Sequence, residues 1–230
     1  NMSEKVVEIE KAYGELNLEL MQEFTDANGI SGNEKAATRV MKKWLEGVAD
    51  EFSYDNLGSL IALKKGSGDG VKLMLAGHID EIGFVVRHID DKGFLKIAPV
   101  GGWWGHVLLS QALTITTRDG REYMGIVGSK PPHGMPADVR NKVIDVKDMF
   151  VDLGVKDKAE VELLGIRPGD MVTPRSDFNV MANPNYLAAK AWDDRIGAII
   201  ASEVLLRLKN ETHSADVYAV GTVQEEVGLR

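Results

Sequence analysis

The 230-residue sequence contains no cysteine. Disulfide cross-links and thiolate metal sites are therefore excluded, and the absence fits a reducing compartment, so we expect a cytoplasmic location. No apolar run approaches the length that spans a membrane, and the polar, acidic amino-terminal stretch does not resemble a signal peptide. We therefore expect no membrane partner.

Positive charge is also scarce, with 27 Lys and Arg against 35 Asp and Glu and a formal net charge of -8. Binding to nucleic acid requires a basic surface, and no cluster of Lys or Arg is present, so nucleic acid is excluded as a partner. The sequence has no Gly-x-Ser-x-Gly elbow, which disfavours a Ser/His/Asp triad. Walker and Rossmann glycine motifs are missing as well.

Helical and strand patterns alternate in the first 81 residues. Apolar spacing predicts helices over 8–26 and over 33–50, the second capped by Asn33. Two strands follow around an Asn-Leu-Gly turn within 51–66, and a short, buried apolar strand is predicted over 71–76. This order is typical of an α/β domain.

The helical period is lost between about Ile82 and Phe178, apart from a weak stretch at 146–153. Strand pairs are predicted around the Asp-Lys-Gly turn, around Asp119-Gly120 and across Pro168-Gly169. A helix then begins near Asp193, and a strand covers 217–223. We therefore predict a discontinuous α/β domain, 1–81 and 179–230, that carries an inserted all-β domain, 82–178.

Histidine and acidic residues follow the predicted elements of the α/β part. His78 comes directly after a strand, where ligand sites of open α/β sheets gather, and Asp80 can orient its imidazole. The alternative for these two residues is a polar surface loop. Asp193 and Asp194 open a helix, so capping explains them as well as metal binding does.

Glu225 and Glu226 end the last strand, where neighbouring side chains point to opposite sides. One of them can then bind a metal while the other faces a reacting water, although a solvated strand end is equally compatible. Taken together, the His, Asp and Glu clusters suit a metal site without thiolates. Paired carboxylates also suit metal-free glycoside hydrolysis, which leaves His78 without a role.

Seven motifs in one order resemble a known family, the dinuclear metalloaminopeptidases that include glutamyl aminopeptidase, deblocking aminopeptidase and the tetrahedral aminopeptidases. Some members of this family have been labelled cellulase or endoglucanase. The resemblance covers nearly the whole chain. The motifs are AGHIDEIGFVV, PVGGWWGHVLLSQ, GIVGSKPPH, FVDLGV, LGIRPGDMV, AWDDRIGA and VGTVQEEVGLR.

The resemblance implies a zinc-peptidase-like α/β sandwich catalytic domain with an inserted β-barrel-like domain, which assembles dimers and often a dodecamer. It also implies two divalent ions, zinc or cobalt, that activate a water to hydrolyse N-terminal residues from short peptides. By resemblance, His78 binds one metal, Asp193 bridges both and Glu226 binds the other. Glu225 corresponds to the general base, and Asp80 supports His78.

The sequence departs from the family pattern at one point. The family supplies two further ligands, an aspartate and a histidine, downstream of the Glu-Glu pair, and these are expected beyond Arg230. We therefore interpret the chain as truncated, with a catalytic domain that is incomplete at its carboxyl end. The 230-residue form alone is expected to bind zinc weakly, and a non-catalytic assembly subunit or a carbohydrate hydrolase remain alternative interpretations.

Overall fold

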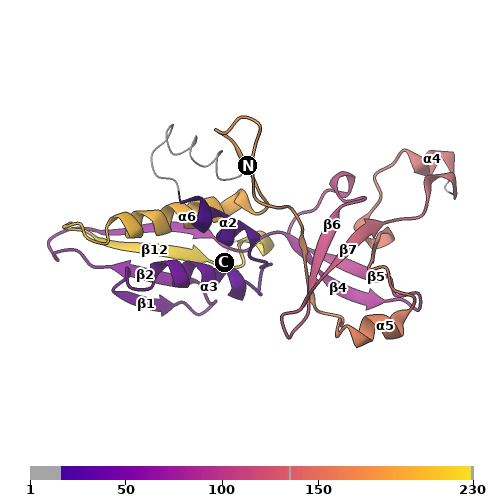
Figure 1. Ribbon diagram of the computed structural model, residues 1–230, viewed down its shortest axis with the longest axis horizontal. Coiled ribbons are helices and arrows are strands. Elements are labelled where there is room, and N and C mark those ends of the chain that lie inside the picture. The colour runs from indigo at the N-terminus through magenta and orange to yellow at the C-terminus, as the bar shows by residue number, and fades with distance from the viewer. Residues whose placement is uncertain (1–16, 135, 229–230) are drawn as a thin grey trace. The chain divides into compact units, whose positions relative to one another are not determined.

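The computed structural model describes residues 17–134 and 136–228 (Figure 1). The chain forms two compact units: Asn1–Glu81 with Ser176–Arg230, and Ile82–Arg175. Phe178, which the sequence analysis assigns to the insert, packs with Leu18 and Val180 in the first unit. None of the helices in the described part of the chain is both long and apolar enough to cross a membrane.

A four-stranded sheet forms the centre of the first unit. Its order is β1 (Glu51–Tyr54), β2 (Leu60–Lys64), β12 (Asp216–Thr222) and β3 (Lys72–His78). The predicted hairpin of β1 and β2 is confirmed, and Asp55 closes its turn by accepting the N–H groups of three successive residues. β12 is antiparallel to β2 but parallel to β3. A short ribbon of β10 (Asn179–Val180) and β11 (Leu187–Ala188) completes the strands of this unit.

Three helices, α2 (Leu18–Asp26), α3 (Lys35–Leu45) and α6 (Trp192–Arg207), share one hydrophobic core with one face of the sheet. On that face a Cβ at Gly77 would overlap the backbone of α6 at Gly197 and Ala198, so only glycine permits this close approach. Buried side chains from α2, α3, the sheet and α6 meet in this core, among them Phe24, Met41, Leu60, Ala219 and Leu205.

Two expectations for this unit are wrong. Asn33 does not cap α3; Glu34 precedes the helix instead, and its side chain turns away toward other partners. β3 is an edge strand of the described sheet rather than a buried strand, and Met74 is 67% exposed on the face opposite the helices. The helix expected over 8–26 is confirmed as α2 from Leu18, and its predicted part before residue 17 lies outside the described residues.

The second unit is a closed barrel, which confirms the predicted β-barrel-like insert. Its strand order is β4-β5-β8-β7-β6-β9. The strands are β4 (Gly83–Ile89), β5 (Leu95–Val100), β6 (Ala112–Thr116), β7 (Glu122–Gly128), β8 (Phe150–Asp152) and β9 (Met171–Pro174). Short helices α4 (Ala137–Arg140) and α5 (Lys158–Leu163), with three single turns of 3₁₀-helix, connect them.

Local predictions within the barrel met mixed outcomes. The hairpins β4–β5 and β6–β7 are confirmed. The strand expected before Pro168 is wrong, because these residues form α5, whose amino terminus is capped by Asp157. The weak helical stretch is a single turn, Val146–Asp148, followed by β8. Trp103 is partly buried against the core of the barrel and stacks on Phe84, with ring centroids 4.6 Å apart.

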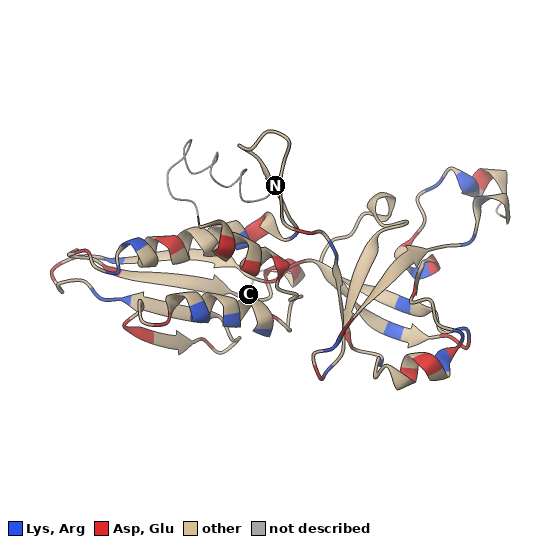
Figure 2. Cartoon of the chain, viewed as in Figure 1, with Lys and Arg blue, Asp and Glu red and all other residues tan. Residues whose placement is uncertain are grey.

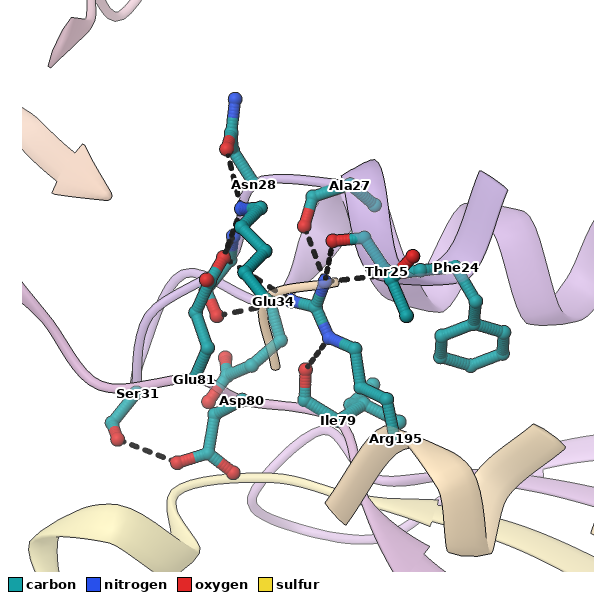
Figure 3. A network of polar contacts seen from close by, with 12 residues as sticks. Phe24, Thr25, Ala27, Asn28, Ser31, Glu34, Ile79, Asp80, Glu81 and Arg195 are labelled. Carbon is teal, nitrogen blue, oxygen red and sulfur yellow. Dashed lines mark hydrogen bonds and ion pairs between the residues drawn. The ribbon is translucent and has the colours of Figure 1, made fainter. Parts of the chain in front are cut away.

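A buried guanidinium, that of Arg195 in α6, ties the helical layer of the first unit to β3 (Figure 3). Its nitrogens donate hydrogen bonds to the backbone carbonyls of Phe24, Thr25, Ala27, Gly29 and Ile79. The Glu81 carboxylate lies 3.5 Å from Arg195 and accepts a 2.7 Å hydrogen bond from Lys190. Because the guanidinium and the Glu81 carboxylate are buried, their charges are tolerated only while these partners remain in place.

Replacing Arg195 by Met is expected to destabilise the protein by about 3–5 kcal/mol, because it leaves several carbonyls without a donor and removes one of two cations from Glu81. Denaturant unfolding measures the loss. Arg207→Met is the matched control on the same helix: Arg207 is exposed, pairs with Glu203 at 3.6 Å and is expected to contribute less than about 1 kcal/mol. Equal losses in the two variants would contradict a structural role for the buried guanidinium.

Candidate metal centre

The parallel pairing of β3 and β12 brings their carboxyl ends to one edge of the sheet. His78, the last residue of β3, lies opposite Thr222 at the end of β12. The chain after β12 forms a 3₁₀ turn, Glu225–Val227. Acidic residues gather here, where β12 ends and α6 begins (Figure 2). Ligand sites of α/β sheets form at this kind of edge.

The His78 ring is held by one nitrogen and presents the other. Nδ1 lies 3.1 Å from the backbone oxygen of Asp80 and 3.5 Å from its Oδ1. Nε2 lies 3.3 Å from Asp193 Oδ1 and 3.6 Å from Glu225 Oε2. An Nδ1–H that donates to Asp80 leaves the Nε2 lone pair facing the two carboxylates, as in a metal-binding histidine with a supporting carboxylate.

Asp193 and Asp194 have different surroundings although they are adjacent. Asp194 Oδ1 accepts the backbone N–H of Gly197 at 3.1 Å and so caps the regular part of α6. Both aspartates have non-helical backbone angles, and the Asp193 side chain is 94% exposed beside His78. The capping explanation therefore applies to Asp194, and Asp193 is available for a ligand.

Glu225 and Glu226 are held through their backbone rather than their side chains. The N–H of Glu225 donates to Asp80 Oδ1 and that of Glu226 to Asp80 Oδ2, each at 3.1 Å. The Glu225 side chain is 42% exposed, and that of Glu226 is partly buried. One buried carboxylate, Asp80, therefore contacts both His78 and the turn that carries the two glutamates.

The charges at this edge shift the pKa values of three groups. Burial lowers the pKa of His78, but the hydrogen bond and charge of Asp80, with a contribution from Glu225, outweigh it and raise the pKa to about 9. Burial raises the pKa of Asp80, yet hydrogen bonds from His78, Ser31 and the backbone lower it to about 2. Burial raises the pKa of Glu226, and the neighbouring carboxylates add to that shift.

The arrangement fits a divalent metal ion. His78, Glu225 and Glu226 each offer a ligand atom, and these atoms lie within 4.8 Å of one another. Asp193 adds an oxygen 3.3 Å from the same imidazole nitrogen. One nitrogen and several carboxylate oxygens form a donor set that zinc and other borderline ions accept. The neighbouring carboxylates that raise the pKa of His78 also create the negative charge that attracts a cation.

Sequence reasoning missed two residues beside this site, Ser31 and Glu34. The Ser31 hydroxyl donates to Asp80 Oδ2 at 2.6 Å. Glu34 is buried and accepts the N–H groups of Gly32 and Gln224 at 2.7 and 3.1 Å. Their spacing, Ser-x-x-Glu before a helix, is a capping-box pattern that would have drawn attention to both residues.

The family model described as M42 glutamyl aminopeptidase matches residues 58–230, and a model described as AMPT matches 16–41. Lysyl aminopeptidase from Pyrococcus furiosus is 37% identical over 214 residues, and glutamyl aminopeptidase from Lactococcus lactis is 30% identical over 209. The matches cover 92% and 90% of this chain but 60% and 59% of those proteins. The chain thus spans about three fifths of the length of these curated relatives.

Solved structures agree with the sequence relatives. The TET aminopeptidase of a marine sediment Thaumarchaeota archaeon superimposes with a TM-score of 0.86 at 41% identity, over 92% of this chain and 59% of that one. A Thermotoga maritima protein described as an endoglucanase gives a TM-score of 0.74 at 30% identity, over 89% and 58%. The M42 family depends on metal ions, in accord with the donor set at the edge of the sheet. The family match over 58–230, with these relatives and structures, places the chain in the M42 glutamyl aminopeptidase family.

Proposed function

We propose that the protein is a metal-dependent aminopeptidase that releases N-terminal residues from short peptides. The observation that carries the proposal is the convergence of a buried imidazole and three carboxylates, those of Asp193, Glu225 and Glu226, at one edge of the sheet. The names of the relatives, lysyl and glutamyl aminopeptidase, support the reaction class.

In this proposal His78, Asp193 and Glu226 bind two divalent ions, zinc or cobalt. The Asp193 side chain, 94% exposed beside His78, would be shared by the two ions, and His78 and Glu226 would each hold one of them. When bound, such ions polarise the scissile carbonyl and lower the pKa of water.

Glu225 is the general base of the proposed reaction. Its carboxylate is partly exposed, 3.6 Å from the ligand nitrogen of His78, and so lies beside the position where water is activated. It takes the proton of the attacking water and returns it to the leaving amine. Asp80 holds the backbone of Glu225 and the ring of His78, so that both face the same space.

The reaction class is tested by chelation of the intact protein. Removing metal with 1,10-phenanthroline is expected to abolish hydrolysis of amino-acid nitroanilides, and added zinc or cobalt to restore it. Cello-oligosaccharides serve as the second substrate, because paired carboxylates hydrolyse glycosides without metal. Sugar hydrolysis that persists in the chelator would replace this proposal with the carbohydrate-hydrolase interpretation.

Glu225→Gln in the intact protein is expected to lower kcat roughly 10²–10⁴-fold, because the general base is lost, while the metal content stays unchanged. Asp193→Asn is expected to lower the metal content itself, because the bridging charge is removed. Nitroanilide kinetics and elemental analysis of the dialysed proteins separate these two effects.

Asp194→Asn is the matched control for these variants, because an asparagine oxygen still caps α6, and the Asp194 carboxylate binds the N–H of Gly197, whereas His78 contacts Asp193. It is expected to retain both metal and activity. An Asp194→Asn variant that lost metal while Asp193→Asn retained it would reverse the assignment of the pair.

Metal binding is expected to release protons and to strengthen with pH up to about 9, because His78 must lose a proton before Nε2 can bind an ion. The pKa of His78 is raised above its ordinary value of 6.5, so its stabilisation of the metal-free protein is complete below pH 6.5 and is lost as the pH rises through about 9. Zinc titration calorimetry at pH 6.5 and 8, in buffers of different ionisation enthalpy, measures the number of protons released and the change of zinc affinity with pH. His213→Gln, outside the metal site, serves as control, and proton-independent binding would exclude His78 as a ligand.

We also propose that the barrel unit mediates self-association, into dimers and higher assemblies, in a cytoplasmic protein. Trp104 is 65% exposed, and Val107 and Leu109 beside it are exposed as well. An apolar, aromatic surface of this kind is typical of a protein interface. One related structure, PhTET1-12s, is a dodecamer, and the Pyrococcus horikoshii TET1 peptidase assembles into a tetrahedron or an octahedral shell.

Trp104→Glu combined with Val107→Glu is expected to reduce the molar mass of the assembly, because charges at this surface oppose burial of the apolar side chains. Light scattering coupled to size-exclusion chromatography measures the mass. Leu163→Glu is the control, since Leu163 is 83% exposed at the end of α5, away from the loop that carries Trp104. A wild-type protein that stays monomeric at high concentration would contradict the proposal.

A further inference from the structure

The turn after β12 is held by two buried carboxylates that come from different parts of the chain. Three successive backbone N–H groups point to them: that of Gln224 donates to Glu34, and those of Glu225 and Glu226 donate to Asp80, each at 3.1 Å. Gln224 adopts left-handed backbone angles, with φ of 61°. A turn with this conformation needs its N–H groups fixed, because a non-glycine residue does not favour it.

Glu34 is not one of the proposed ligands, but its carboxylate contacts the turn that carries Glu225 and Glu226. It is 7% exposed, at the amino-terminal end of α3, and the same oxygen that binds Gln224 also accepts the N–H of Gly32 at 2.7 Å. The carboxylate thus joins the loop before α3 to the turn after β12. Two backbone N–H groups lose their acceptor if it is removed.

Ser31, in the same loop, acts on the second carboxylate. Its hydroxyl donates to Asp80 Oδ2 at 2.6 Å, as Figure 3 shows. That oxygen also accepts the N–H of Glu226, while Oδ1 accepts the N–H of Glu225 and faces His78. The orientation of the Asp80 carboxylate, and with it both glutamates and the imidazole, is therefore set partly by Ser31.

We propose that Glu34 and Ser31 are positioning residues of the metal centre, which hold the Glu225–Glu226 turn and Asp80 in the geometry that binds the ions. The inference rests on the function proposed above. Ligand oxygens must lie within a few tenths of an ångström of their bonding distance, so a turn that moves loses metal affinity even when every ligand is present. Removing outer partners of ligands typically costs 10–100-fold in metal affinity or activity.

Glu34→Ala and Glu34→Gln in the intact protein separate this role from a contribution of charge. Gln keeps an oxygen acceptor for Gly32 and Gln224, whereas Ala removes it. Titration with Co²⁺, followed by its visible absorption, is expected to show about 10–100-fold weaker binding for Glu34→Ala and binding within about threefold of wild type for Glu34→Gln. kcat is expected to follow metal affinity, while KM at saturating metal changes little.

Asp170→Ala is the matched control for loss of a buried carboxylate. Asp170 is 2% exposed in the barrel unit and accepts the N–H of Arg167 at 2.8 Å, so its removal costs stability without affecting the turn. Thermal unfolding of all variants is measured beside Co²⁺ binding. Equal Co²⁺ affinity in Glu34→Ala and Asp170→Ala, or equal losses in Glu34→Ala and Glu34→Gln, would overturn the inference.

The Ser31 variants decide the question if Glu34→Ala does not fold. Ser31→Ala is expected to weaken Co²⁺ binding several-fold, because Asp80 loses its hydroxyl donor, and Ser31→Thr to restore it. Unchanged affinity in Ser31→Ala would then overturn the inference. A wild-type protein that binds no Co²⁺ and hydrolyses no nitroanilide refutes the proposed function instead, so the two failures are distinguishable.

Discussion

The parallel pairing of β3 with β12 is the constraint on which the candidate site depends. Antiparallel neighbours would place the ends of these strands at opposite edges of the sheet, whereas parallel strands end together. The register sets His78 opposite Thr222, so the loops that follow the two strands start side by side. α6 runs back from that edge and carries Asp193 in its first turn. Residues from three distant parts of the sequence therefore meet without any long side chain having to bridge them.

Arg195 couples this edge to the core of the same unit. It lies two residues after Asp193, and its buried guanidinium binds Ile79, directly after β3, Phe24 in the last turn of α2 and Ala27 in the loop after α2. The first turn of α6 therefore presents the Asp193 side chain to solvent and buries that of Arg195 completely. Since the partners of Arg195 are mostly carbonyl oxygens, whose positions depend on the backbone, the position of Asp193 and the fold of the α2–β3 region are linked.

Local sequence patterns predicted part of the fold and of the candidate site. Alternating apolar residues around the Asp-Gly turn specified β6 and β7, and the strand-end positions of His78 and the two glutamates indicated the site. A strand was predicted for the residues that form α5, because a short apolar run fits either a helical or a strand period. The structure has a helix there, capped by Asp157. Glu34 was missed because its deciding partner, Gln224, is far away in sequence. The contacts of Arg195 are backbone carbonyls of other segments and the Glu81 carboxylate, which no local pattern reveals.

In both acidic pairs, the groups that fix the local structure are not the carboxylates proposed to act at the site. The Asp194 carboxylate accepts the N–H of Gly197, and the Asp193 side chain remains in solvent. The Glu225–Glu226 turn is held by its backbone N–H groups, so both side chains are available to the site. An exposed carboxylate stays ionised at little cost, but it has no fixed position of its own. Asp80 and Glu34, the supports, are more deeply buried than the acidic ligands, and both accept hydrogen bonds from the backbone. The acidic ligands need only short, well-anchored segments of backbone to reach the same few ångströms of space.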